Sequence, residues 1–140
     1  MYLKEKISIK LARLEKNIRY LKKYSNINPE ELESDWTLLS AIERNFQVAI
    51  EIVLDIGGMI ISEEEQEKPE SYRDVILMLG KIGVFSEEFA EKFAPAAGFR
   101  NILVHIYEEV QINLVCDFIR DYLSDFDLIA KYFVKYLENK

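Results

Sequence analysis

Apolar residues recur every three or four positions along most of this chain, and that spacing limits its fold more than any other feature. Such steps place side chains on one face of an α-helix, because a helix turns by about 100° per residue. The first segment shows the pattern with Leu3, Ile7, Leu11, Leu14, Ile18 and Leu21. We therefore predict a long amphipathic helix there, with charged residues such as Lys16 and Lys22 facing water.

A second helix is predicted to follow the polar stretch SNINPEEL. Asn28 suits the N-cap position, Pro29 suits the first helical position, and two glutamates complement the helix dipole in the first turn. The apolar stripe of this helix comprises Leu32, Trp36, Leu39, Ile42, Phe46, Ile50 and Val53. We expect the pair Gly57-Gly58 to weaken or end it.

The middle of the chain is predicted to hold shorter helices. Residues 62–71 read SEEEQEKPES and are predicted to form a polar loop. Residues 71–80 then predict one short helix, and residues 83–95 predict another, capped by Ser86 and ended by Pro95.

The C-terminal third completes an all-α pattern. Residues 96–110 predict a further helix or the start of one. A long amphipathic helix then carries Val115, Phe118, Tyr122, Phe126, Ile129, Phe133 and Tyr136. With only five glycines and three prolines, the chain has few of the tight turns that a sandwich or barrel needs. The sequence therefore predicts one domain over residues 1–140, a single up-and-down bundle of four main helices plus short helices.

Composition limits the partners of this bundle. The net charge of −7 argues against a broad nucleic-acid-binding surface, and we expect no DNA partner, although a small basic cleft stays possible. Lysines interrupt the start of the chain and no uninterrupted apolar run approaches a membrane span, so neither a signal segment nor a membrane partner is expected. The single cysteine, Cys116, cannot form an internal disulfide. A cytoplasmic location and a buried thiol follow as expectations.

The only histidine, His105, lies in the stretch GFRNILVHIYEEV, residues 98–110. On a helix, Asn101 lies one turn before His105 and within hydrogen-bonding reach of it. Arg100 and Tyr107 are seven residues apart and nearly in line, and a long arginine can reach around the axis toward the imidazole. One helix face can thus present a cation, a titratable base and a phenol.

This combination suits phosphate chemistry without a metal. An imidazole titrates near neutrality, so it can take a proton from a hydroxyl or return one to a leaving oxygen. A guanidinium offers a planar fork of donors that fits phosphate oxygens. RNA supplies its own nucleophile in the 2′-hydroxyl, and the chain shows no metal-ligand spacing. Spacing alone leaves open a second interpretation, a histidine that is hydrogen-bonded within a helix interface.

The stretch RNILVHIY resembles the R-x4-H-x-Y motif of the HepT-like family in the HEPN superfamily of helical domains. Arg100, His105 and Tyr107 match the three motif positions, and Asn101 occupies the polar position after the arginine. AIERNFQVAIEIVLDIGGMII resembles the family's second helix, and the residues from PESYRD to the motif resemble its middle. The resemblance covers most of the chain from about Glu30 onward.

The resemblance implies a toxin that acts as a metal-independent endoribonuclease. Its homodimer would bring two motif helices together across a cleft, where two Arg100 side chains would make a positive spot on an acidic protein. His105 would be the acid/base, and Arg100 would bind the phosphate. Asn101 would orient the imidazole or the phosphate. The chain would need no cofactor of its own. The implied antitoxin is a minimal nucleotidyltransferase, which would use ATP and magnesium to transfer AMP to Tyr107.

Two other interpretations remain open. One is a non-catalytic, nucleotide-binding partner subunit of a nucleotidyltransferase, which suits the acidic surface. The other is a structural bundle whose stripes form an interface. Trp36 is expected in the core or in a dimer contact, and Arg44 is expected either near the cleft or in an exposed ion pair beside Glu43. Packing roles are expected for Tyr122, Tyr132 and Tyr136.

Overall fold

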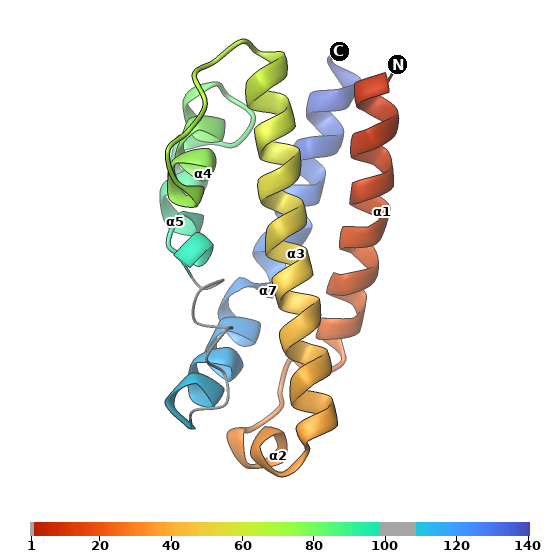
Figure 1. Ribbon diagram of the computed structural model, residues 1–140, viewed down its shortest axis with the longest axis vertical. Helices are drawn as coiled ribbons and strands as arrows, with labels where there is room; N and C mark the ends of the chain where they lie inside the picture. Colours follow the sequence, from red (N-terminus) through yellow and green to blue (C-terminus); the bar gives the residue numbers. More distant parts are fainter. Residues whose placement is uncertain (1, 99–108) are drawn as a thin grey trace.

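The chain is built of helices throughout the part that the computed structural model describes, residues 2–98 and 109–140 (Figure 1). The all-α class predicted from the sequence is confirmed. The described helices are α1 (Tyr2–Lys22), α2 (Pro29–Ser34), α3 (Trp36–Glu63), α4 (Tyr72–Lys81), α5 (Glu87–Phe93) and α7 (Glu109–Glu138).

Among the described helices, three long ones form the body of the bundle. In Figure 1, α1, α3 and α7 run along the long axis, and the two ends of the chain lie at the same end of the bundle. α1 packs against both α3 and α7, while α2 closes the opposite end against the same two helices. α4 and α5 pack against each other on the side of α3 away from α1. The apolar stripes predicted for the first and last helices are confirmed, because Leu14, Phe126 and Phe133 are completely buried.

The predicted second helix is two helices that meet at Asp35. Its start is as predicted, because Asn28 Oδ1 accepts a hydrogen bond of 2.9 Å from the backbone N–H of Glu31. The continuous helix through Asp35 was wrong. The backbone N–H of Asp35 donates to the carbonyl of Leu32 at the end of α2, at 3.3 Å. Its carboxylate accepts from the N–H of Leu38 in the first turn of α3, at 3.0 Å. An aspartate at this position is a strong N-cap, and the new helix begins immediately after it.

The glycine pair in α3 does not end the helix, which continues from Gly57 and Gly58 to Glu63. Packing explains the difference. A Cβ at Gly57 would lie 2.8 Å from Val75 Cγ1 and 3.0 Å from Leu79 Cδ1, so the glycine leaves room for α4 to approach α3. A glycine costs about 1 kcal/mol in a helix interior. That cost is small beside the tertiary packing that stabilises an amphipathic helix.

α3 is mainly a core helix. Its length and composition alone would allow it to cross a membrane, but 56% of its most apolar 18-residue window is buried inside the bundle. Trp36, at its first turn, is 68% exposed. Of the two places expected for Trp36, the core is therefore wrong: as the first residue of α3 it lies at the exposed end of the helix, and a dimer contact stays a prediction.

The short helices α4 and α5 confirm the two predicted in the middle of the chain. α4 runs one residue beyond Gly80, and a turn with Gly83 at φ 84° then leads toward α5. A Cβ at Gly80 would lie 2.6 Å from the Cβ of Ala90 on α5. Glycine at this position therefore permits the close approach of the two helices.

Candidate active site

All four predicted site residues lie outside the described residues: Arg100, Asn101, His105 and Tyr107. The structure describes both ends of the segment that carries them. Gly98 is the last described residue before it, and Glu109 begins α7 after it. The described residues therefore show how the scaffold holds the segment on its two sides.

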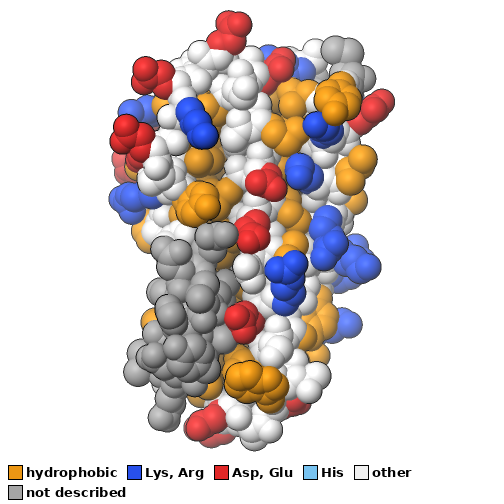
Figure 2. Space-filling model, in the orientation of Figure 1, with side chains coloured by type: hydrophobic (Ala, Val, Ile, Leu, Met, Phe, Trp, Pro, Cys, Tyr) orange, Lys and Arg blue, Asp and Glu red, His pale blue; other side chains and the backbone are white. Residues whose placement is uncertain are grey.

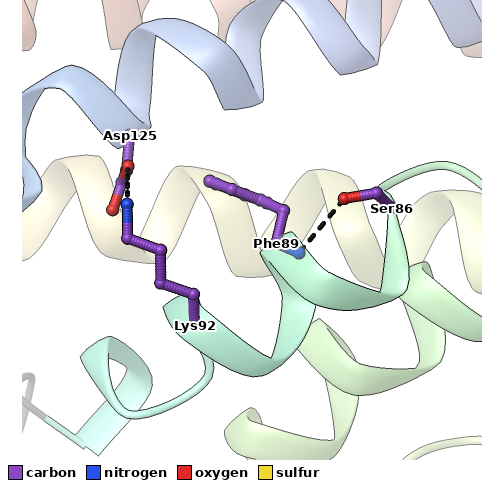
Figure 3. Close-up of polar contacts among 4 residues, drawn as sticks. All are labelled: Ser86, Phe89, Lys92 and Asp125. Carbon is purple, nitrogen blue, oxygen red and sulfur yellow. Dashed lines mark hydrogen bonds and ion pairs between the residues drawn. The ribbon is translucent and has the colours of Figure 1, made fainter.

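The upstream side is α5 and the turn that follows it. Ser86 Oγ accepts a hydrogen bond of 3.1 Å from the backbone N–H of Phe89 and so caps the start of α5 (Figure 3). After Phe93 the chain turns at Pro95, whose carbonyl accepts a hydrogen bond of 3.1 Å from the N–H of Gly98. The three alanines in this turn are buried. The chain thus reaches Gly98 along a packed and hydrogen-bonded path.

An ion pair joins α5 to α7. Lys92 Nζ lies 3.3 Å from Asp125 Oδ1, although the two residues are 33 positions apart in the sequence (Figure 3). The Asp125 side chain is only 6% exposed, whereas that of Lys92 is 65% exposed. Asp125 Oδ2 is buried and accepts no hydrogen bond in the described part of the chain. Among the described residues, Lys92 is therefore the cation that compensates the buried charge of Asp125.

Aromatic rings fill the space between α5 and α7 beside that ion pair. The ring of Phe93 stacks on that of Phe89, with centroids 5.7 Å apart. It also meets the rings of Phe126 and Tyr122 edge-on, at 5.6 Å and 6.0 Å. Edge-to-face pairs at these distances add to the stability that burial alone provides. The helices on the two sides of the motif segment are thus fixed to each other.

A polar strip runs along the middle of α3. Glu43, Gln47 and Glu51 are four residues apart, and Gln47 Nε2 donates to Glu51 Oε1 at 3.4 Å. Burial raises the pKa of the half-buried Glu43 carboxyl. Arg44 is exposed and forms no ion pair within residues 2–98 and 109–140, so the ion pair considered for it beside Glu43 is not formed.

The sequence did not single out several of these polar residues, namely Gln47, Glu51, Lys92 and Asp125. The four-residue spacing of the α3 strip was a usable signal for Gln47 and Glu51. Nothing in the sequence indicated the ion pair of Lys92 with Asp125, because it depends on how α5 and α7 pack. The described His, Cys, Asp and Glu residues include no group of three or more placed to hold a metal ion.

Cys116 is buried, and Tyr122, Tyr132 and Tyr136 are partly buried against the core, which confirms the packing roles predicted for them. Cys116 is a free, buried cysteine, and burial raises the pKa of its thiol. Tyr122 stacks on Phe118 with centroids 4.5 Å apart. The hydroxyl of Tyr132 lies 3.4 Å from Ser86 Oγ.

The fold and the scaffold around the motif segment define a small all-α bundle in which α5 and α7 are fixed to each other on either side of that segment. Residues 14–133 match the family model described as Ribonuclease HepT-like. Because this match covers most of the chain, the chain belongs to the HepT-like ribonuclease family, as its motif predicted.

Curated relatives carry nuclease names. The chain is 28% identical over 131 residues to the tRNA nuclease HepT of Aphanizomenon flos-aquae, which covers 94% of this chain and 89% of that protein. It is 27% identical over 97 residues to the mRNA nuclease HepT of Shewanella oneidensis, which covers 69% of this chain and 73% of that protein.

Solved structures share the fold. A crystal structure of the toxin–antitoxin MntA–HpeT aligns with a TM-score of 0.81 at 22% identity, covering 92% of this chain and 97% of that one. A structure of the tri-AMPylated HEPN toxin of Shewanella oneidensis in complex with an MNT antitoxin aligns with a TM-score of 0.79 at 23% identity, covering 92% and 96%. At these identities the likeness concerns the fold.

Proposed function

We propose that this protein is an endoribonuclease toxin of a toxin–antitoxin pair. The observation that carries the proposal is the match to the HepT-like ribonuclease family over residues 14–133, a range that includes the whole R-x4-H-x-Y stretch. The names of the relatives, a tRNA nuclease and an mRNA nuclease, support RNA as the substrate.

In the proposed reaction the 2′-hydroxyl of RNA attacks the neighbouring phosphorus. His105 takes the proton from that hydroxyl, and the bond from phosphorus to the 5′-oxygen breaks. The protonated imidazole of His105 returns a proton to the leaving 5′-oxygen, and the upstream fragment keeps a 2′,3′-cyclic phosphate. Arg100 binds the phosphate oxygens and offsets the charge that develops on them, while Asn101 orients the imidazole or the phosphate. No metal ion is required for these steps.

The active assembly in this proposal is a homodimer whose cleft collects residues from both subunits. Two Arg100 side chains in one cleft would provide local positive charge on a protein with a net charge of −7. A two-fold symmetric pair of motif segments is the simplest arrangement that brings them together. The exposed Trp36 is available for such a contact.

A cleavage assay on purified protein tests the proposed reaction. The parent should cut RNA in the presence of EDTA, and His105→Ala or Arg100→Ala should lower the rate by about 10²–10⁴-fold. Arg100→Lys should restore part of the rate, because lysine keeps the charge without the planar fork. The exposed Arg73 provides a matched control, and Arg73→Ala should cut like the parent. Equal rates for parent and His105→Ala would remove the imidazole from the mechanism.

Control by the antitoxin is the second part of the proposal. A nucleotidyltransferase partner supplied with ATP and magnesium should add AMP to Tyr107, placing a phosphodiester anion and a bulky base beside Arg100. The AMPylated state of the structurally similar Shewanella toxin supports this chemistry. Mass spectrometry should show added AMP on the parent and none on Tyr107→Phe, which should stay toxic beside the partner. AMP on another residue, or silencing of Tyr107→Phe, would refute this assignment.

A further inference from the structure

Charge is distributed unevenly along the chain. Residues 1–23 contain eight lysines and arginines and two glutamates, a net charge of +6. Residues 24–140 contain ten basic and 23 acidic residues, a net charge of −13. The acidic total therefore conceals one basic helix, and such asymmetry is typical of chains with a polyanionic partner.

Four of these cations form a continuous row along the outer face of α1 and the turn that follows it. Arg13, Lys16, Arg19 and Lys23 follow one another at steps of three and four residues, opposite the buried apolar stripe of the helix. Lys23 lies just beyond α1 in a turn closed by its N–H donating to the carbonyl of Tyr20, at 3.2 Å. Figure 2 shows lysine and arginine side chains gathered over the α1 side of the molecule. We call these four residues the basic ridge; at 1.5 Å per residue it is roughly 15 Å long.

The ridge cations differ from Lys10 and Lys22 in having no ion-pair partner among the described residues. Lys10 lies 3.6 Å from Asp55 on α3, and Lys22 lies 2.7 Å from Asp127 on α7, so these two lysines help to hold α1 in the bundle. All four ridge side chains are exposed, and none forms an ion pair with any residue that the structure describes. Folding therefore leaves their charges available to a partner.

A groove beside the ridge extends the positive charge toward α7. The groove has a volume of about 700 Å³, and Arg19 forms part of its wall together with the exposed Lys131 and Lys135 on α7. Two carboxylates that are not ion-paired within the described chain, Glu15 and Glu138, also line it. The cations outnumber them, so an anionic chain that follows the ridge can continue into the groove.

Aromatic rings lie next to the cations at one end of the ridge. The Nζ of Lys23 is 5.9 Å from the centroid of the Tyr20 ring, and that ring lies 5.4 Å from the ring of Tyr24. Cations that track a backbone beside rings that can stack on bases are the two components of single-stranded nucleic-acid sites. A lipid surface fits less well, because membrane-surface helices insert their apolar face. The apolar face of α1 is already buried, with Ile7 and Leu14 completely inaccessible.

We propose that the basic ridge binds the phosphate backbone of RNA and holds the substrate at a site separate from the cleavage motif. This inference rests on the proposed ribonuclease function, which makes RNA the expected polyanion. Each ridge cation that meets a phosphate releases a counterion, so the interaction weakens steeply as salt rises.

Two triple variants with the same change in charge test the proposal. Lys16→Gln/Arg19→Gln/Lys23→Gln removes three ridge charges, and Lys68→Gln/Arg73→Gln/Lys81→Gln removes three exposed charges elsewhere. Binding is measured by fluorescence anisotropy with a 2′-O-methylated RNA, which lacks the proposed nucleophile and is therefore bound without being cut. The ridge variant should bind about tenfold more weakly, and its slope of log affinity against log salt should fall by about 2. The control variant should bind within about twofold of the parent. Circular dichroism should show equal helix content in all three proteins.

Equal RNA affinity for the two triple variants would overturn the proposal. So would ridge-dependent binding to phosphatidylserine vesicles with no ridge dependence for RNA, which would make the ridge a membrane site. The two proposals fail separately. A parent that binds RNA through the ridge but leaves unmodified RNA uncut would refute the ribonuclease and keep the ridge. If the parent cuts RNA but the ridge variant binds RNA like the control variant, the ridge proposal is refuted and the ribonuclease proposal is kept.

Discussion

Two helix–helix contacts in this bundle are formed by different types of side chain. The contact of α1 with α3 is mainly aliphatic, and its buried polar group is Asn17, which donates to Asn45 Oδ1 at 2.8 Å. The contact of α5 with α7 is aromatic and includes the ion pair of Lys92 with the buried Asp125. We refer to them as the aliphatic contact and the aromatic contact.

The difference indicates a difference in role. The aliphatic contact joins two helices of the main body and stabilises the bundle through non-directional burial. The aromatic contact joins the helices on either side of the motif segment through rings and charges that have preferred geometries. We therefore expect damage to the aliphatic contact to lower stability alone, and damage to the aromatic contact to lower both stability and activity.

The largest effect should come from one buried side chain in each contact. Phe93 and Leu14 are 2% and 0% exposed. Phe93→Ala should cost about 3–5 kcal/mol of unfolding free energy, and Leu14→Ala about 2–5 kcal/mol. Urea unfolding measures both costs, and RNA cleavage is then compared where each variant is still folded. Only Phe93→Ala should cut more slowly per folded molecule. Equal cleavage by the two variants would contradict the expectation that only the aromatic contact affects activity.

A smaller effect is expected from the ion pair in the aromatic contact. Lys92→Met leaves the buried Asp125 carboxylate without its partner and should cost about 1–3 kcal/mol. Lys92→Met/Asp125→Leu should regain most of that loss, because a buried pair can be replaced by apolar groups. Lys10 is the control: its partner Asp55 is 62% exposed, so Lys10→Met should cost less than about 1 kcal/mol. Equal costs for the two single variants in thermal unfolding would contradict the structural distinction.

The smallest effect should come from a hydrogen bond outside both contacts. The hydroxyl of Tyr136 on α7 donates to Glu64 Oε2, at the end of α3, over 2.7 Å. Tyr136→Phe should cost about 0.5–1.5 kcal/mol and leave cleavage unchanged.

The same tyrosine should give a pH signature. Burial, aided by the hydrogen bond to Glu64, raises the pKa of Tyr136 from 10.0 to about 12. The folded state thus favours the neutral phenol, so its contribution to stability is full below pH 10 and is lost as the pH rises toward 12. Thermal unfolding should show the gap between parent and Tyr136→Phe closing across this range. A constant gap would mean that the phenol titrates as in the unfolded chain.

Much of the fold could be predicted because apolar periodicity reports directly on helix faces. The errors occurred where a second effect competed with that pattern. Leu32 and Trp36 are four residues apart, so the stripe appeared continuous across Asp35, but a side chain that caps the next helix divided it. The break expected at Gly57 did not occur, because the approach of α4 needs a residue without a Cβ in an otherwise well-packed helix.

The site was predictable only where it is local in the sequence. The R-x4-H-x-Y stretch spans eight residues and could be recognised as a string of letters. The ion pair of Lys92 with Asp125 joins residues 33 positions apart, and its formation depends on how the rings between α5 and α7 pack. The basic ridge was hidden for another reason, since a net charge of −7 averages one positive helix with a strongly negative remainder.

The backbone N–H of Asp35 closes the end of α2, and its carboxylate caps the start of α3. These two hydrogen bonds fix the rotation of α3 about its axis relative to α2. One residue inserted after the cap would turn every later side chain of the helix by about 100° relative to α2. The directions in which the polar strip of α3 and Gly57 face therefore depend on the position of the Asp35 cap. We expect natural insertions and deletions to occur in the loops and not between α2 and α3.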